Sequence, residues 1–165
     1  MLTEFTLPVT PSAPTETNLA GGNRPMLTLA ETRLAIVVDP ALSLGELANT
    51  VGALSIGIGA ARPSLAGDEL RDREGQPFHT SAKCPVPVLQ ANGEVLRDLY
   101  RRMATKPPEA VMVLFPKFAR PLHAFSDYVD ALASRALADE PLDGLAIAGP
   151  AKWVRSLTGA LKLLR

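Results

Sequence analysis

The chain has 165 residues, 47% of them hydrophobic and 21% charged, and its formal net charge at neutral pH is zero. These values are typical of one globular domain and give no net positive charge to attract nucleic acid or an anionic membrane. No apolar stretch reaches the ~20 residues of a membrane span, and the first residues lack the pattern of a secretory signal. The single cysteine, Cys84, excludes an intramolecular disulfide and a multi-cysteine zinc site. We therefore expect a cytoplasmic protein.

Residues 1–30 are rich in Thr, Pro, Ser and Gly and contain few large apolar side chains. Such a segment buries too little apolar surface to offset the entropy of ordering it. We predict a flexible tail over residues 1–30 and a single α/β domain over residues 31–165. An alternative for the tail is that Phe5, Leu7 and Val9 add an edge strand to a neighbouring protein.

The domain opens with an apolar run, Leu34–Val38, which predicts a strand covered on both faces. Ser43 and Glu46 have the spacing of a capping box, so a helix should begin there and end near Gly57 and Gly59. Its apolar stripe contains Leu44, Leu47, Ala48, Val51, Leu54 and Ile58. The small residues Ala48, Gly52 and Ala53 leave one side of this helix thin enough for a backbone to approach.

In the middle of the chain the sequence signals for secondary structure are weaker. Two short strands, at 69–71 and 77–79, flank a turn at 73–76. Residues 86–90 predict a strand that Pro87 places at an edge or a bulge. Asn92 should then cap a helix that ends before Pro107.

The last third continues the alternation of strands and helices. Residues 111–115 predict a strand, and a helix should follow from about Leu122. The apolar stripe of that helix contains Phe125, Tyr128, Val129, Leu132 and Ala136. A strand at 145–148 leads to a helix with Pro150 at its first position and Gly159 at its end. This order predicts an α/β fold, a three-layer α/β/α sandwich with a mixed sheet.

The segment from Gly144 to Leu164 has a Gly-Pro before the final helix and a Thr-Gly followed by Leu-Lys-Leu at its end. It resembles the closing segment of type-2 peptidyl-tRNA hydrolases, and Ala48-Asn49 looks like the Ala-Gln pair of their opening unit. The whole run from Leu34 to Arg165 resembles a set of uncharacterised prokaryotic proteins thought to share the hydrolase fold. The resemblance implies a peptidyl-tRNA hydrolase type 2-like scaffold and, because those hydrolases form dimers, a homodimer.

Two departures from the hydrolases bear on activity. The hydrolases have a lysine at the start of the first helix, where this chain has Leu44-Gly45-Glu46. They also have an aspartate after the third strand, where this chain has Pro116-Lys117-Phe118-Ala119. Ester hydrolysis needs a group that activates water and a cation that stabilises the oxyanion, so the departures argue against that activity. A lysine and an acid meeting at the same hollow from elsewhere in the chain would reverse this interpretation.

Two positions suggest ligand binding. Asp39 follows the first strand beside the start of the Ser43-capped helix that carries Asn49, and ligands of open α/β sheets collect where strands end. Asp39 is equally well explained as a turn residue before Pro40. At the start of the last helix, Gly149 and Lys152 offer free amides and an ammonium group to a phosphate or carboxylate.

The remaining reactive side chains give weaker signals. Cys84 and His79 would form a nucleophile and base pair only if the short hairpin brought them together, and an exposed histidine beside a half-buried thiol is the simpler interpretation. The other histidine, His123, is interpreted as a surface or capping residue. No familiar ligand spacing occurs, so we predict no metal site and no cofactor.

Basic residues cluster on two helices, at 97–106 and 152–165, but charged helix faces are usually only solvated, so we do not expect RNA binding. The sequence favours a binding module for a small anionic ligand or a protein partner on a hydrolase-like scaffold. The alternative is a hydrolase that uses Asp39, His79 or Cys84, including one with residual peptidyl-tRNA hydrolase-like activity. The residues alone leave open whether the protein is an enzyme.

Overall fold

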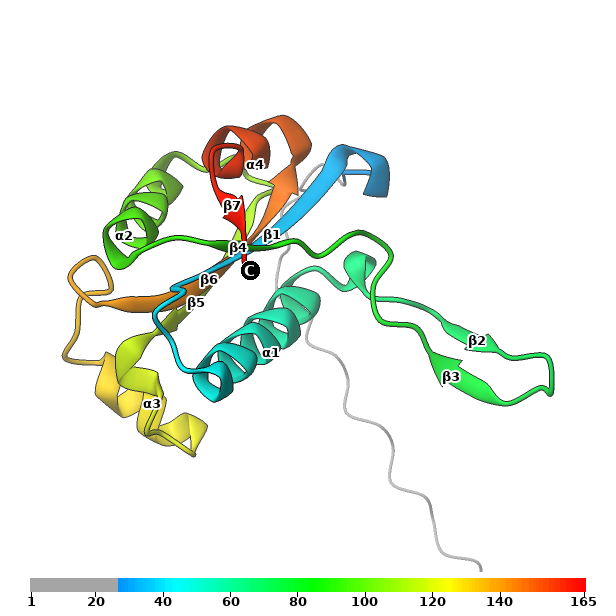
Figure 1. Cartoon of the computed structure of the whole chain (residues 1–165), viewed down its shortest axis with the longest axis horizontal. Coiled ribbons are helices and arrows are strands. Elements are labelled where there is room, and N and C mark those ends of the chain that lie inside the picture. The colour runs from blue at the N-terminus through cyan, green and yellow to red at the C-terminus, as the bar shows by residue number, and fades with distance from the viewer. Residues whose placement is uncertain (1–26) are drawn as a thin grey trace, which may run out of the picture.

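The structure, a computed structural model, describes residues 27–165 and contains a five-stranded mixed sheet in the order β5-β6-β1-β4-β7 (Figure 1). Its strands are β1 (Thr32–Val38), β4 (Val88–Gln90), β5 (Val111–Pro116), β6 (Leu142–Pro150) and β7 (Lys162–Leu163). The α-helices of this region are α1 (Leu44–Ala61), α2 (Gly93–Arg102), α3 (Phe125–Leu132) and α4 (Ala151–Thr158). Short 3-10 helices are η1 (Leu29–Glu31), η2 (Pro63–Leu65), η3 (Met103–Thr105) and η4 (Lys117–Ala119).

Helices cover both faces of the sheet because the side chains of its central strands alternate between two apolar clusters. From β1, Ala35 and Val37 pack with α2 and α4, whereas Leu34, Ile36 and Val38 pack with α1. Figure 1 shows α1 on one side of the sheet and α2 with α4 on the other. The predicted α/β class and mixed sheet are confirmed, and the predicted tail lies outside the described residues except for its last four.

The α1 helix begins where the sequence predicted and ends later. The Ser43 hydroxyl accepts from the Glu46 amide, and the Glu46 carboxylate accepts from the Ser43 amide at 3.0 Å. The predicted end near Gly57 and Gly59 is wrong, because the helix continues to Ala61. At Gly57 the helix lies against β5, where an added Cβ would stand 2.7 Å from a methyl group of Val113. Close helix packing, not termination, explains this glycine.

The apolar stripe predicted for the third helix does not enter the core. The α3 helix begins at Phe125, not Leu122, and none of its residues is buried. The Phe125 side chain is 80% exposed and Val129 is 49% exposed. Leu44, at the start of the α1 stripe, is also 84% exposed. In both places apolar side chains recur at helical spacing in the sequence. The described chain has no element that buries them.

The C-terminal half of the sheet differs in detail from the prediction. Pro87 lies just before β4, and β4 is not an edge strand because β7 pairs with it on the side away from β1. Strand β7 is only two residues long and was not predicted from the sequence. Pro150 is the N-cap residue of α4 and not its first helical residue.

The short hairpin was predicted correctly. Strands β2 (Glu69–Arg71) and β3 (Pro77–His79) pair in antiparallel fashion and project away from the sheet (Figure 1). Gly75 has a φ of 84°, a left-handed conformation that glycine adopts without strain. The Asp72 carboxylate accepts from the amides of Glu74 and Gln76 and closes the turn.

Candidate functional site

The predicted site residues lie at opposite ends of the sheet. Val38 at the end of β1 pairs with Gly144, and Thr32 at its start pairs with Pro150. We call these the carboxyl end and the amino end of the sheet, after β1. Asp39, Ser43 and Asn49 belong to the carboxyl end, whereas Gly149 and Lys152 belong to the amino end. The four residues proposed from sequence as ligand contacts therefore do not form one site.

At the carboxyl end, Arg120 joins two acidic side chains from different elements. Its Nη1 donates to Glu46 of α1 at 2.8 Å, and its Nη2 donates to Asp143 of β6 at 2.7 Å. Arg120 Nε donates to the second oxygen of Asp143. The Asp143 side chain is only 4% exposed. A buried carboxylate requires such a partner, so this cluster is a structural tie between the segment after β5, α1 and β6.

The oxygens of these two acids are all engaged. Glu46 Oε2 accepts from the amide and the hydroxyl of Ser43, at 3.0 and 2.8 Å. Hydrogen bonds from Ser43, followed by the charges of Arg120 and Lys117, hold the pKa of Glu46 below its ordinary value. Hydrogen bonding to Asp143 raises the pKa of Arg120. Neither acid has a free oxygen with which to activate water.

The structure adds Arg120 to the charges that the sequence shows at the hollow beside α1. The sequence interpretation noted that the hydrolases' lysine and aspartate are missing, at positions where this chain has Glu46 and Lys117. The structure places Arg120 and Glu46 there, in a hollow of about 310 Å³ that Asn49 also lines. Lys117 lies near enough to lower the pKa of Glu46. Opposite charges do meet in this hollow, but the charge of Arg120 is already neutralised by Glu46 and Asp143.

Asp39 follows β1 and forms a turn. Its Oδ1 accepts from the Ala41 amide at 2.9 Å, and its own amide donates to the Asp143 carbonyl at 2.9 Å. The first contact is the turn that the sequence offered as the alternative to a ligand site. The negative charge of Asp39 also contributes to the raised pKa of Arg120, so Asp39 lies near the paired cluster.

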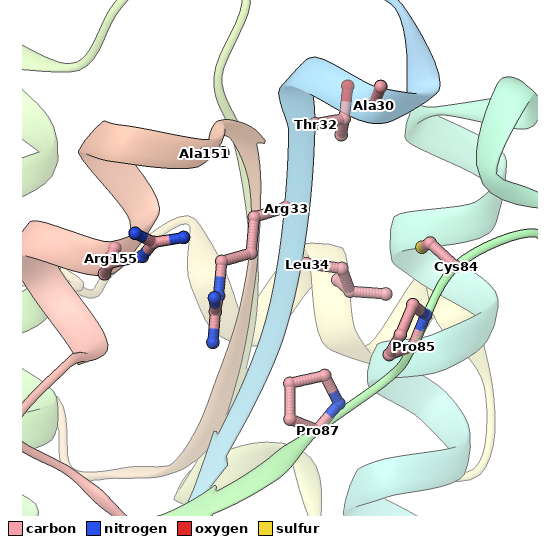
Figure 2. Close-up of a pocket in the computed structure, with 9 residues that line it drawn as sticks. All are labelled: Ala30, Thr32, Arg33, Leu34, Cys84, Pro85, Pro87, Ala151 and Arg155. Atoms are coloured by element: carbon pink, nitrogen blue, oxygen red, sulfur yellow. The ribbon is translucent and has the colours of Figure 1, made fainter.

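The amino end has a second hollow, of about 410 Å³ (Figure 2). We call it the amino-end pocket, and its lining comes from η1 and β1, from the segment before β4, and from α4. The lining residues are Ala30, Thr32, Arg33, Leu34, Cys84, Pro85, Pro87, Ala151 and Arg155. Figure 2 shows Arg33 and Arg155 on the α4 side of β1, with the Arg155 guanidinium turned towards Arg33. Leu34, Pro85 and Pro87 lie on the other side.

The charges at the amino-end pocket are unpaired. Within residues 27–165, neither Arg33 nor Arg155 forms an ion pair. No acidic residue is among those that line the pocket. Two guanidinium groups share one hollow without an internal counterion, which is the opposite of the arrangement around Arg120.

The pocket exists because a proline interrupts the pairing of β1 with β4. The Ile36 amide donates to the Pro87 carbonyl at 3.0 Å, so the polar groups of Ile36 face β4. By strand alternation, those of Leu34 face the same way. Pro87 has no N–H to donate to the Leu34 carbonyl, so the ladder stops there. Next to Leu34 the two segments separate and leave the hollow.

Cys84 and His79 are not paired. The His79 side chain is 78% exposed and its Nε2 lies 3.7 Å from a Glu69 oxygen. Cys84 is half-buried, and burial raises the pKa of its thiol. Its sequence neighbour Lys83 is bound to Asp68 at 2.7 Å. Nothing in the described contacts activates Cys84 as a nucleophile.

Sequence reasoning missed Arg33, Arg120 and Asp143, and it considered Arg155 only as part of a basic cluster. One signal was available: Asp143 interrupts an apolar strand, and a carboxylate in such a run needs a cation. No sequence signal connects Arg33 to Arg155. In the described part of the chain, no three His, Cys, Asp or Glu side chains lie close enough together to hold a metal ion.

By length and composition, α1 is apolar enough to cross a membrane, with a mean hydropathy of 1.2 over 18 residues, of which 17% are buried. This finding differs from the sequence interpretation, which found no such stretch. The buried side chains of α1 are Thr50, Leu54 and Ile58, which lie against the sheet. The apolar character of α1 is therefore only partly explained by contact with the domain.

Comparisons with known proteins identify relatives without an assigned activity. Residues 32–165 match the model of a family described as "Protein of unknown function (DUF2000)". A solved structure, the protein of unknown function Atu0240 from Agrobacterium tumefaciens str. C58, is similar at a TM-score of 0.73 and 20% identity. The match covers 81% of this chain and 97% of that one, and at this identity it shows the fold alone. No curated protein matches the sequence.

Proposed function

The chain belongs to the DUF2000 family of proteins of unknown function, and we propose that it binds a small anionic ligand in the amino-end pocket. The observation that carries the proposal is the pair of guanidinium groups, Arg33 and Arg155, that line this hollow without an ion-pair partner in residues 27–165. An anion between them would remove their mutual repulsion and accept charge-assisted hydrogen bonds from both.

The chemistry of the lining limits the ligand class. A volume of about 410 Å³ lies within the range of small-molecule sites. The guanidinium fork matches the oxygens of a carboxylate or phosphate, and Pro85 and Pro87, which line the hollow on the other side of β1, suit an apolar portion that extends past the strand. The ligand we propose is therefore a small molecule with one carboxylate or phosphate group and an apolar part.

Titration calorimetry with inorganic phosphate and with phenyl phosphate, which adds an apolar part to one phosphate group, tests this proposal. We expect Arg33→Gln and Arg155→Gln each to weaken binding roughly tenfold or more, because a hydrogen bond to a charged group contributes about 1.5–3 kcal/mol. Arg73→Gln is the matched control, since Arg73 is 95% exposed on the hairpin. Failure of both anions to bind, or binding that neither pocket substitution weakens, contradicts the proposal.

A hydrolase at the carboxyl end is the alternative, favoured by the proximity of Asp39 and Lys117 to the Arg120 cluster. In that case Asp39 would activate water and Lys117 would stabilise the oxyanion. The test is release of free tRNA from peptidyl-tRNA by the wild-type protein and by Asp39→Asn. We expect no release above the uncatalysed rate. Release that Asp39→Asn abolishes would establish the hydrolase instead.

A further inference from the structure

A second hollow, of about 470 Å³, lies beside the amino-end pocket, between β1 and the second half of α1. We call it the α1 hollow. Among residues 27–165, only uncharged residues line it, and two serines supply its polar side chains. Its apolar lining includes Leu34, Ile58, Gly59, Leu65, Ala82 and Val86. A surface of this composition favours an apolar group over a polar one.

The α1 hollow and the amino-end pocket adjoin each other at Leu34, which lines both. In the segment before β4, Ala82 and Val86 line the α1 hollow, whereas Cys84 and Pro85 between them line the amino-end pocket. Figure 2 shows Leu34 and Cys84 on the same side of β1, away from the two guanidinium groups. A ligand that extends past β1 where its pairing with β4 stops therefore reaches the α1 hollow.

The α1 hollow is open because small residues surround a packed base. Leu34, Ile58 and Leu65 form the base, and all three are buried in the same apolar cluster. Above them, a Cβ added at Gly59 would meet nothing within 4 Å. A side chain at position 59 would therefore occupy space that the glycine leaves free for another molecule.

The side of the α1 hollow opposite α1 is held by backbone contacts. Ala66 and Ala82 form an isolated antiparallel bridge at the base of the hairpin. The Lys83 amide also donates to the Leu65 carbonyl at 3.0 Å. These contacts fix the segment after β3 relative to η2, so the hollow is formed before any ligand enters. Preformed, largely apolar hollows of this size are typical of small-molecule sites.

We propose that the α1 hollow holds the hydrocarbon chain of a ligand whose anionic group lies between Arg33 and Arg155. The inference rests on the proposed anion site and assigns the apolar part of the same ligand. The ligand class is then an alkyl phosphate or a fatty carboxylate. A chain in the α1 hollow removes apolar surface of both molecules from water. A sugar phosphate would bury hydroxyl groups there with few hydrogen-bond partners.

Titration calorimetry with ethyl, butyl, hexyl and octyl phosphate, each below its micelle concentration, tests the chain site. We expect the affinity to rise about three- to fourfold for each methylene group that enters the hollow, as burial of a methylene group predicts. Octanoate, compared with octyl phosphate, then identifies the preferred anionic group.

Gly59→Leu is the variant that should remove this rise. Its side chain fills the α1 hollow, so octyl phosphate should bind no more tightly than ethyl phosphate, and inorganic phosphate should bind as before. Leucine favours a helix more than glycine does, so the variant should fold. Gly52→Leu is the matched control, because Gly52 lies in the same helix with nothing within 4 Å and lines neither hollow. Circular dichroism confirms that both variants are folded.

Cys84 gives a second readout that does not depend on a variant. It is the single cysteine of the chain, is half-buried and lies where the two hollows adjoin. Octyl phosphate bound as proposed should slow the alkylation of Cys84 by a maleimide well beyond the effect of saturating inorganic phosphate. Equal rates with the two ligands at saturation would contradict a chain beside Cys84.

Two further results would overturn the chain site while leaving the anion site in place. One is equal affinity for ethyl and octyl phosphate in a protein that binds inorganic phosphate. The other is a rise with chain length that Gly59→Leu preserves or that Gly52→Leu removes, since the chain would then lie elsewhere. If inorganic phosphate and every alkyl phosphate fail to bind, the anion site itself is wrong and the chain site falls with it.

Discussion

The two ends of the sheet hold arginines in opposite situations. At the carboxyl end, Arg120 is bound by Glu46 and by Asp143, whose side chain is 4% exposed. At the amino end, Arg33 and Arg155 share a hollow with no acid among its lining residues. In the first arrangement, Arg120 is paired with acids of the same domain. In the second, the guanidinium donors are free to bind another molecule.

This difference separates charges that stabilise the fold from charges that are available for binding. A buried ion pair becomes costly when one partner is removed, because the remaining charge stays away from water. An exposed, unpaired arginine contributes little to stability and can be removed without such a cost. Substitutions at the two ends should therefore give opposite results for stability and for ligand binding.

The largest effect is expected for Arg120→Met. It leaves the Asp143 carboxylate buried without a cation, which should lower the free energy of unfolding by about 3–5 kcal/mol. Urea unfolding followed by circular dichroism measures the change. Arg120→Met combined with Asp143→Leu should recover most of the loss, since the stranded charge is then absent. A loss below about 1 kcal/mol for the single substitution would show that the pair is not structural.

A smaller effect, dependent on pH, is expected for Glu46. Its pKa is lower in the folded protein than its ordinary value of 4.5, chiefly through hydrogen bonds from Ser43. A group with a depressed pKa contributes stability above its unfolded pKa and loses it as the pH falls through the folded pKa. Glu46→Gln should therefore flatten the decline in melting temperature below pH 4.5. An unchanged decline would remove Glu46 from the stabilising cluster.

The smallest change in stability is expected at the amino end. Arg33→Gln combined with Arg155→Gln should alter the free energy of unfolding by no more than about 0.5 kcal/mol in buffer free of multivalent anions. The same urea titrations measure it beside Arg120→Met. A loss of more than about 2 kcal/mol would mean that these arginines are structural and would end the contrast between the two ends.

The fold was largely predictable because its signals are local. The Leu34–Val38 run and the Ser43–Glu46 capping box each specify an element within a few residues, and both were found where expected. The errors arose where tertiary contacts determine whether a side chain is buried or a strand forms. The apolar residues of α3, such as Phe125, recur at helical spacing, but none of them is buried. Strand β7 has two residues and forms only because the chain returns to pair with β4.

The sites were less predictable because their residues are distant in sequence. Arg120 and Asp143 are 23 positions apart, and Arg120 and Glu46 are 74 apart. Their meeting depends on β5 and β6 being antiparallel and on α1 lying over that end of the sheet. The resemblance to peptidyl-tRNA hydrolases concerns the start of α1 and the segment after β5, where the hydrolases' lysine and aspartate are missing. It gives no information about charged residues that reach the same place from other positions in the chain. That link, the cytoplasmic location and the absence of RNA binding stay predictions.

The most direct test of the central claim follows the arginine side chains themselves. In ¹H–¹⁵N spectra of the Nε–Hε groups, titration with phosphate should shift the signals of Arg33 and Arg155 and leave that of Arg120 in place. Assignment uses the Arg→Gln variants at 33 and 155 and the Met variant at 120. A shift confined to Arg120, or no shift at Arg33 and Arg155 at saturating phosphate, would contradict an anion site at the amino end of the sheet.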